Sequence, residues 1–526
     1  MKNQFLTAVY QYDTYTENGA VSHSTTGSEL LNYFSKSGTF RDRKLKEVFA
    51  DMGKIWAESP KIALQIIFYN RLISRKVKGF VESEKVQKGQ GNRSEFRKGI
   101  TWLARYHKQH LYPNLWLIPV VGSWKDLWHR ELIGELDHKQ VYALLKKGIE
   151  DEYNKDLIAK YLPRIRSKSN TFNDRHKALN KFAYGFLKYM NWTPTDYRKF
   201  KAEGKAHEFQ RKMCDNKWNE INFLKIPGKA LFSLVNKKGK DGQTSFERHD
   251  IEEAYVEWIK QQPTAKFTGY VYELMNQVTQ KLSLAQKITL DKQFDGLIEL
   301  AKADNQGIQE NVWCALDTSG SMAAKVADTT AFNICISLGV YFATLNEGAF
   351  KDHVIMFDSE SKVKQLSGTF TDKVLQITSA NTAWGTTNFQ SVIDEIVRVR
   401  QQNPKIPVAD FPTTLIVVSD MQFNPVNGNT QTNYEAAMQK LAQVRLPRMR
   451  IVWWWVTGRG GDFPNKLDDK GVIMIGGFDG SILSLLIGGE QEQVEKGQAK
   501  TAVNQTPIEA MLKALNQDVL KKISLQ

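Results

Sequence analysis

Five short runs of apolar residues in the second half of the chain constrain its fold more than any other feature. They cover residues 311–316, 353–357, 414–419, 450–456 and 472–475. Stretches with helical periodicity alternate with them, at about residues 325–347, 388–401, 431–445 and 480–487. Because the runs are apolar throughout, both faces of each predicted strand should be buried. The pattern predicts a mostly parallel sheet with helices on both faces, a doubly wound α/β fold.

Polar side chains follow two of these predicted strands. Asp317-Thr318-Ser319-Gly320-Ser321 comes directly after the run Val312–Leu316, and Asp420 comes directly after the run Thr414–Ser419. Between them, Trp384–Phe389 is a loop rich in Gly and Thr that opens a helical stretch. Ligands of such sheets bind at the carboxyl ends of the strands. Carboxylates and hydroxyls are hard oxygen ligands, which suit magnesium better than zinc.

The order of these three pieces resembles the metal-ion-dependent adhesion site of von Willebrand factor A domains. In that family the motif D-x-S-x-S, a threonine in a middle loop and an aspartate after a later strand hold the metal. The resemblance implies that Mg²⁺ or another divalent cation is held by Asp317, Ser319, Ser321, Thr387 and Asp420. Thr386 is the rival for the threonine position. Because Mg²⁺ takes few carboxylates, the site should keep a coordination position for an acidic group of a protein partner.

Charge is distributed unevenly along the chain. The 72 Lys and Arg residues exceed the 57 Asp and Glu residues by 15, yet residues 306–526 have a net charge of −2 and residues 1–305 a net charge of +17. Residues 160–240 alone hold 20 basic and 6 acidic residues. Such asymmetry predicts binding to a polyanion, for which RNA or another nucleic acid is the best candidate. The predicted phosphate contacts are Arg164, Arg166, Lys168, Arg175, His176, Lys177, Lys181, Arg198, Lys199 and Lys201.

Aromatic residues are interleaved with these cations, and two interpretations are open for them. They could stack on bases, or they could form the buried faces of amphipathic helices; the helical spacing favours buried faces. The remainder of residues 1–305 shows helical stripes such as Lys61–Tyr69 and no strand pattern. Many short helices predict an α-helical array of HEAT-like repeats, although no period of roughly 40–47 residues is present.

The predicted organisation therefore has three parts. Residues 1–305 form a basic α-helical module, residues 306–489 form the A domain, and residues 490–526 form a linker and a C-terminal helix that packs on either of the other two. Thr506-Pro507-Ile508-Glu509 has the sequence of a helix start, with an N-cap, a proline at N1 and a capping-box glutamate, and the helix should run to about Ile523.

A helical module followed by an A domain resembles the Ro autoantigen family, whose helical ring is called the TROVE module. The chain is still more similar to an uncharacterised group of plant, microbial and viral proteins with the same layout. The segments that carry this resemblance are Thr16–Ala20, Ser24–Ser28, Ser59-Pro60, Phe68–Arg71, Ile118–Leu127, Met213-Cys214 with Trp218, and Phe246–Asp250. The resemblance implies a ribonucleoprotein that binds structured or misfolded RNA.

Several classes of protein are disfavoured by what the sequence lacks. The motifs G-x-x-x-x-G-K-[ST], H-E-x-x-H and G-x-S-x-G are missing, and two aspartates are too few for two-metal nuclease chemistry, so we expect no enzyme. The three cysteines lack metal-ligand spacing, and no apolar run approaches eighteen residues. We therefore expect a protein that does not associate with membranes and acts in a reducing cytoplasm, including that of a host if a virus or phage encodes it.

Two functional hypotheses follow from the sequence. The first is a non-enzymatic RNA-binding scaffold whose helical module holds RNA and whose A domain recruits a protein through Mg²⁺. The second is a protein-interaction or assembly adaptor without RNA binding, whose partner is an AAA-type ATPase or a viral assembly. The charge asymmetry favours the first hypothesis.

Overall fold

The computed structural model describes residues 14–167, 173–204, 207–305, 311–379, 384–426, 428–487 and 504–526. The chain divides into two compact units, which we describe separately. The sheet unit consists of the residues up to Phe40 together with Trp218–Ala514, and the helical unit consists of Arg41–Lys217 together with Leu515–Gln526. These units group the chain by contacts, whereas the boundaries at 305 and 489 rest on sequence motifs and stay predictions.

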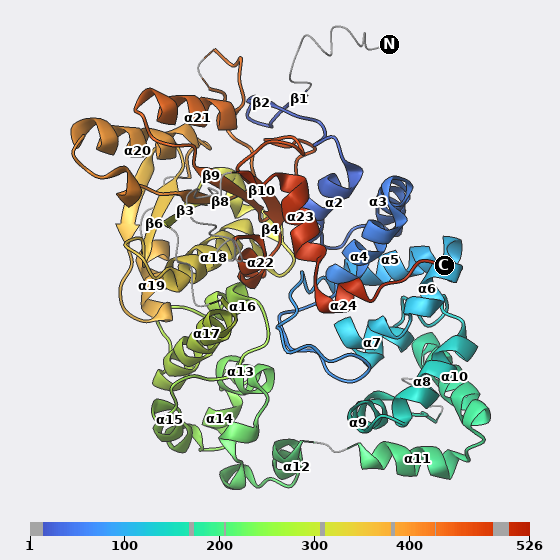
Figure 1. Ribbon diagram of the computed structural model, residues 1–526. Helices are drawn as coiled ribbons and strands as arrows, with labels where there is room; N and C mark the ends of the chain where they lie inside the picture. Colours follow the sequence, from blue (N-terminus) through green and yellow to red (C-terminus); the bar gives the residue numbers. More distant parts are fainter. Residues whose placement is uncertain are drawn as a thin grey trace. The chain divides into compact units, whose positions relative to one another are not determined.

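A six-stranded mixed sheet forms the core of the sheet unit (Figure 1). Its strands are β3 (Val312–Asp317), β6 (His353–Phe357), β7 (Ser361–Gln365), β8 (Thr414–Ser419), β9 (Arg450–Trp455) and β10 (Val472–Gly476). The spatial order is β10-β9-β8-β3-β6-β7, and all neighbours are parallel except the edge pair β6 and β7. The predicted α/β fold is confirmed. Strand β7 was missed because this edge strand has only one apolar residue, Val363, and so shows neither an apolar run nor an alternating pattern.

Helices cover the two faces of this sheet. Helix α18 (Ala331–Leu345) packs on β3, β6 and β8, and α19 (Phe370–Thr378) packs beside α18. Helices α20 (Gln390–Gln402) and α21 (Asn433–Gln443) pack against each other on the opposite face (Figure 1). The predicted helix at 325–347 begins only at Ala331, because residues 325–330 form the hairpin β4 (Lys325–Val326) and β5 (Thr329–Thr330).

The sheet core accounts for the tryptophan run of β9. Trp453, Trp454 and Trp455 are all at most 1% exposed. The indole N–H groups of Trp453 and Trp454 donate to Asn465 Oδ1 and to the Gly477 carbonyl, at 2.7 and 2.9 Å. Buried rings whose N–H groups are satisfied stabilise a core. These tryptophans therefore pack the sheet.

The beginning of the chain completes the sheet unit. It forms β1 (Thr14–Tyr15), β2 (Val21–Ser22) and α2 (Glu29–Ser37), and α2 packs against β10. Lys36, in the last turn of α2, is buried and donates to the carbonyls of Gly460 and Asp462, each at 2.9 Å. The segment was predicted to belong to the helical module on its position in the chain; its contacts place it on the sheet.

The other helices of the sheet unit lie before β3 and after β10. They are η3 (Trp218–Glu220), η4 (Phe223–Lys225), α13 (Gly228–Asn236), α14 (Ser245–Arg248), α15 (Glu252–Lys260), α16 (Val271–Met275), α17 (Leu284–Asn305), η7 (Gly480–Ile482), α22 (Leu483–Ile487) and α23 (Pro507–Leu515). His249 stacks on Trp218 with a centroid distance of 3.9 Å, and Arg248 pairs with Asp241 at 2.7 Å, so these two residues of the segment Phe246–Asp250 make structural contacts.

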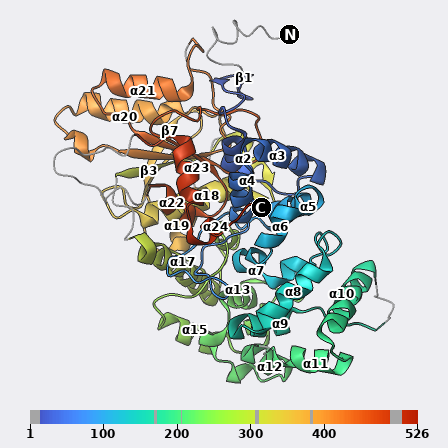
Figure 2. The same cartoon turned by 45° about the vertical axis from the view of Figure 1, so that its right-hand side comes forward.

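The helical unit consists of short helices with no strand in the described residues. They are α3 (Leu45–Glu58), α4 (Pro60–Tyr69), α5 (Arg93–Tyr106), α6 (Lys108–Leu111), η1 (Tyr112–Asn114), α7 (Leu117–Val121), η2 (Trp124–Trp128), α8 (His138–Ile149), α9 (Glu152–Tyr161), α10 (Asp174–Met190), α11 (Pro194–Glu203), α12 (Glu208–Cys214) and α24 (Asp518–Lys521). Helix α3 packs on α4 and α5, and α8 packs on α9 and α10 (Figure 2). The helical character predicted for this region is confirmed.

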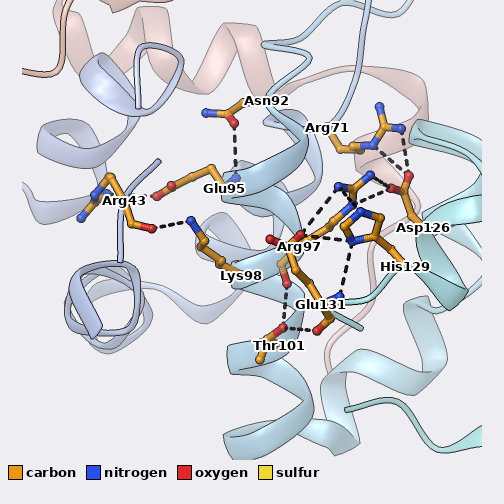
Figure 3. A network of polar contacts seen from close by, with 10 residues as sticks. All are labelled: Arg43, Arg71, Asn92, Glu95, Arg97, Lys98, Thr101, Asp126, His129 and Glu131. Carbon is orange, nitrogen blue, oxygen red and sulfur yellow. Dashed lines mark hydrogen bonds and ion pairs between the residues drawn. The ribbon is translucent and has the colours of Figure 1, made fainter. Parts of the chain in front are cut away.

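An ion-pair network ties the centre of the helical unit together (Figure 3). The Asp126 carboxylate is buried and accepts from Arg71 Nε at 3.0 Å and from Arg97 Nε and Nη2 at 2.9 and 2.8 Å. Gly122 permits this approach, because a Cβ there would lie 2.6 Å from Asp126 Oδ2 and 2.7 Å from Arg71 Nε. Two segments singled out in the sequence, Phe68–Arg71 and Ile118–Leu127, thus meet in one structural cluster.

The C-terminal helix is divided in two. It begins as predicted, since Thr506 N–H donates to the Glu509 carboxylate at 2.8 Å and Glu509 N–H donates to the Thr506 hydroxyl at 3.4 Å. It ends at Leu515 and continues as α24, because the Gln517 side chain bonds the backbone N–H and carbonyl of Lys88 at 2.7 and 2.9 Å. No described helix of either unit is long and apolar enough to traverse a bilayer.

Candidate functional site

The strand order creates a crevice at the carboxyl edge of the sheet. From β3 the chain passes to β6 on one side and later returns to β8 on the other, so the topology switches between β3 and β8. Open α/β sheets bind ligands at such a point. Asp317 ends β3 and Asp420 directly follows β8, where Leu316 is in register with Val418. Both carboxylates therefore lie where a ligand is expected.

Hydrogen bonds orient the first carboxylate. Asp317 is fully buried, its Oδ1 accepts from the Ser319 N–H at 2.9 Å, and its Oδ2 accepts from the Ser419 hydroxyl. The hydroxyls of Ser319 and Ser321 lie 3.2 Å apart. The motif that follows β3 therefore gathers its oxygens at the end of the strand, as the sequence predicted for residues 317, 319 and 321.

The second carboxylate is joined to the first loop. Asp420 is 2% exposed, accepts from the Gln422 N–H at 3.2 Å, and is hydrogen-bonded to the Ser321 hydroxyl. Met421, the next residue, has a left-handed backbone with φ of 65°, and its N–H donates to the Ser419 hydroxyl at 2.9 Å. Left-handed conformations of such residues are costly and concentrate at functional sites.

The middle loop completes the cluster. Gly320 N–H donates to the Gly385 carbonyl at 3.1 Å, and Asn424 N–H donates to the Thr387 carbonyl at 2.9 Å. Thr387 is buried, whereas its rival Thr386 is exposed and accepts from Asn424 Nδ2 at 2.8 Å. Three loops thus bring all five predicted residues to one edge of the sheet, with Thr387 on the inside.

The electrostatics of the two carboxylates fit a divalent cation. Burial raises the pKa of Asp317, and the charge of Asp420 raises it further; burial also raises the pKa of Asp420. Across the residues that the structure describes, neither carboxylate forms a direct ion pair with a lysine or arginine, although the more distant charge of Arg459 lowers the pKa of Asp420 against the effect of burial. Buried charges require a counter-charge or a metal. Two carboxylates surrounded by hydroxyls are the hard oxygen donors that Mg²⁺ prefers.

Sequence reasoning missed the contribution of the N-terminal arm, which we define as Thr16–Gly19. Asn18 Nδ2 donates to the Gln422 carbonyl, to Asn424 Oδ1 at 3.3 Å and to the Thr387 hydroxyl at 3.4 Å. The arm therefore lies directly at the predicted cation site. The segment Thr16–Ala20 had been noted only as part of a resemblance, and no local pattern connects it with a loop some 400 residues later.

The predicted phosphate contacts are in the helical unit, and most are exposed. The exposed ones are Arg164, Arg166, Arg175, Lys177, Lys181, Arg198 and Lys199; His176 is half-buried and Lys168 lies outside the described residues. Lys201 differs, because it is half-buried and its Nζ donates to the carbonyls of Leu162 and of Ala159, the latter at 3.2 Å. Burial lowers the pKa of Lys201 to about 8. This lysine braces α11 against α9 and is a poor candidate for a phosphate contact.

The interleaved rings are mostly structural. Phe182, Phe186, Tyr197 and Phe200 are buried, and the Tyr197 hydroxyl donates to the Pro163 carbonyl at 2.7 Å. This burial agrees with the interpretation of amphipathic helices. The exceptions are two tyrosines of α10, Tyr184 and Tyr189, which are 51% and 44% exposed. They lie on the same helix as Lys177 and Lys181.

Comparisons with known proteins match both parts of the chain to groups without an established function. Residues 312–522 match a domain of unknown function (DUF7788), and residues 16–188 match another (DUF2828). An uncharacterised protein of Acanthamoeba polyphaga mimivirus, L728, is 23% identical over 519 residues, which span 91% of this chain and 85% of that protein.

One solved structure also resembles the chain. It is the crystal structure of the Deinococcus radiodurans RO (RSR) protein, at 13% identity and a TM-score of 0.36 over 87% of this chain and 97% of that protein. A TM-score this low carries no argument about function.

Proposed function

We propose that this protein is a non-enzymatic RNA-binding scaffold. The helical unit binds structured or misfolded RNA through exposed lysines and arginines. The sheet unit recruits a protein through Mg²⁺, or another divalent cation, to which the partner contributes an acidic group. The two activities reside in different units of the chain.

The observation that carries the RNA-binding half is the exposed charge of residues 164–201. This segment has ten Lys and Arg residues but only two carboxylates, Asp174 and Asp196. Asp174 pairs with Lys177 at 2.9 Å, and Asp196 is held by the Thr193 N–H and hydroxyl at the start of α11, at 2.9 and 2.7 Å, so the remaining cations of the segment are in excess. Surfaces without such a role usually intersperse the two signs of charge. An unbalanced set of exposed cations can neutralise the charges of a phosphate backbone.

The decisive measurement is RNA affinity as a function of salt. Fluorescence anisotropy with a labelled stem-loop RNA should give a linear decrease of log affinity with log salt concentration, because bound cations release counterions from phosphates. Reversing Arg175, Lys177 and Lys181 to Glu, all on α10, should reduce the steepness of that slope by roughly 2 to 3, given about 0.7–0.9 per lost contact.

A matched control separates a defined surface from general charge. Reversing Lys46, Lys54 and Lys61, which are exposed on α3 and α4 of the same unit, changes the net charge equally. We expect this control to change the slope much less than the α10 variant. Equal effects of the two triple variants would contradict the placement on α10, and binding without salt dependence would contradict RNA binding altogether.

The metal half of the proposal rests on the two buried carboxylates. Asp317, Ser319, Ser321, Thr387 and Asp420 would hold the cation, which would supply a Lewis-acidic position for a carboxylate of the partner. Calorimetry with Mn²⁺ should detect binding to the wild type, and Asp317→Ala should abolish it while leaving RNA affinity unchanged.

The adaptor hypothesis is distinguished by a pulldown. Protein partners that survive nuclease treatment, depend on the divalent cation and bind the α10 variant normally, in the absence of measurable RNA affinity, would favour an adaptor without RNA binding. RNA in the purified protein, seen as a raised ratio of absorbance at 260 to 280 nm, would favour the scaffold.

A further inference from the structure

Helix α10 turns one face to the interior of the helical unit, where it packs on α8 (Figure 2). The buried residues of that face are Phe182, Ala183, Phe186 and Leu187. The Tyr142 hydroxyl of α8 donates to the Phe182 carbonyl at 3.0 Å, and the two rings lie 5.2 Å apart. Gly185 permits this approach, because a Cβ there would clash with the Tyr142 hydroxyl. Packing therefore determines which side of α10 is left to solvent.

The solvent side of α10 carries a line of exposed residues, which we call the α10 stripe. It consists of Lys177, Lys181, Tyr184 and Lys188. At about 100° per residue these four positions lie within roughly 60° of one another around the helix axis, so their side chains share one face. Lys188 is an exposed cation beyond the predicted phosphate contacts. The stripe therefore presents a ring among lysines.

The side chains on either side of this ring are uncommitted. Lys177 pairs with Asp174 at 2.9 Å at the beginning of α10. Across the part of the chain that the structure describes, no hydrogen bond, ion pair or ring contact involves the side chain of Lys181, Tyr184 or Lys188. Tyr184 is 51% exposed. Nothing within the described chain accounts for a bare ring at this position.

A ring between two cations is suited to one element of RNA. Lys181 and Lys188 lie three positions before and four positions after Tyr184, which is about one helical turn, or roughly 5 Å along the axis, on either side. Ammonium groups bind phosphates, and an exposed aromatic ring stacks on a base. An acidic protein surface would satisfy the lysines but would leave the ring without a partner. A base reaches such a ring only when it is unpaired, because the bases of a duplex are stacked inside it.

We propose that Tyr184 stacks on an unpaired base of the bound RNA, while Lys181 and Lys188 contact the phosphates on either side of that base. The inference rests on the RNA-binding half of the proposed function and deepens it, because it names the part of the RNA that the helical unit recognises. Every base has a face on which a ring can stack. The α10 stripe therefore prefers unpaired segments to duplexes without reading a sequence.

The test compares two labelled RNAs by fluorescence anisotropy with the full-length chain. One is an unstructured single strand, and the other is the fully paired duplex of the same sequence. Tyr184→Ala should weaken binding of the single strand roughly 5- to 150-fold, the loss expected for one stacked base, and leave duplex binding unchanged. The slope of log affinity against log salt concentration should stay that of the wild type, because no cation is removed.

Two further variants isolate the contribution of the ring. Tyr184→Phe keeps the ring and should bind both RNAs as the wild type does. Tyr153→Ala is the matched control, because Tyr153 is 48% exposed on α9 of the same unit, in a stretch that also exposes Glu152 and Asp156. Its affinities should equal those of the wild type. A thermal melt of each variant verifies folding, which should be retained because both tyrosines are exposed.

The outcomes separate the inference from the proposed function. If the wild type binds neither RNA, or binds without salt dependence, the RNA-binding half of the proposed function fails and the inference fails with it. If the wild type binds with a salt-dependent affinity but Tyr184→Ala matches Tyr153→Ala, RNA binding stands and the inference is overturned. Equal losses for the single strand and the duplex, or a loss in Tyr184→Phe as large as that in Tyr184→Ala, would also overturn it, because a stacked ring gives neither result.

Discussion

Replacing Asp126 by alanine should destabilise the helical unit more than any other single change of charge in it. The Asp126 carboxylate is 1% exposed, and the Arg71 and Arg97 side chains that bind it are 7% and 15% exposed (Figure 3). Burial lowers the pKa of Arg71, and the charge of Asp126 opposes that shift. The variant removes this compensation and leaves Arg71 buried without its counter-charge.

The magnitude follows from the two arginines separately. Removing one partner of a buried ion pair costs about 3–5 kcal/mol. Arg97 can shift toward Glu131, whose carboxylate is already within 3.6 Å, so its share should be small. Arg71 is less exposed to water than Arg97. The free energy of unfolding should therefore fall by about 3–4 kcal/mol, nearly all of it because Arg71 loses its partner. A loss of that size is a large fraction of the 5–15 kcal/mol that stabilises a typical domain.

Hydrogen exchange followed by mass spectrometry resolves the two units in one measurement. The free energy of opening should fall in peptides of α5 and η2, and peptides of β3 and β8 should keep their protection. The control is Asp241→Ala, which breaks an exposed ion pair with Arg248 and should leave the protection of every peptide close to that of the wild type, because exposed ion pairs contribute little to stability. If Asp126→Ala came within about 1 kcal/mol of the wild type, the assignment of this cluster as a stabilising core would be refuted.

Further predictions concern packing, pH and the cation. Gly122→Ala should lower the free energy of unfolding by roughly 1–3 kcal/mol, because the added Cβ would meet Asp126 and Arg71. Gly53→Ala on α3 should raise it by up to about 1 kcal/mol, because the space around Gly53 is open and alanine favours a helix. Chemical denaturation of the two variants measures both changes. Burial lowers the pKa of Lys36 from 10.5 to about 8, so the native state binds fewer protons than the unfolded state between those pH values. The free energy of unfolding should therefore rise from about pH 8 to pH 10, by up to about 3 kcal/mol relative to the variant Lys36→Met. A flat difference between these two proteins over that pH range would contradict the burial of the charged amine. Mg²⁺ should raise the melting temperature of the wild type and leave that of Asp317→Ala unchanged.

Local patterns in the sequence were enough to predict five of the six strands of the main sheet and the two aspartates beside them. A strand buried on both faces must be apolar throughout, so the runs that became β3, β6, β8, β9 and β10 could be recognised without any partner. The helix start at Thr506 was equally local, since its capping bonds join residues three apart. The half-exposed strand β7 lacked such a pattern and was missed.

Contacts between distant segments decided the remainder. Lys201 and Lys199 are two positions apart on one helix, yet Lys199 is exposed and Lys201 donates to two carbonyls of the helical unit. A count of charges assigns one positive charge to each of them and does not register the direction in which the side chain points. That direction depends on what packs against the helix. The charge count therefore predicted a basic surface but included a lysine that does not belong to it.

The candidate site shows the same division between sequence and structure. That Asp317 ends one buried strand and Asp420 directly follows another could be predicted from the sequence, because hydrophobic runs and the residues that terminate them are local properties. The folded chain was needed to show that β3 and β8 are neighbours, and that the N-terminal arm bonds Gln422, which lies 405 residues after Glu17 in the chain. Strand pairing and docking of the arm depend on packing between segments that no local pattern relates, so two aspartates and an arm that are far apart in the sequence meet at one edge of one sheet.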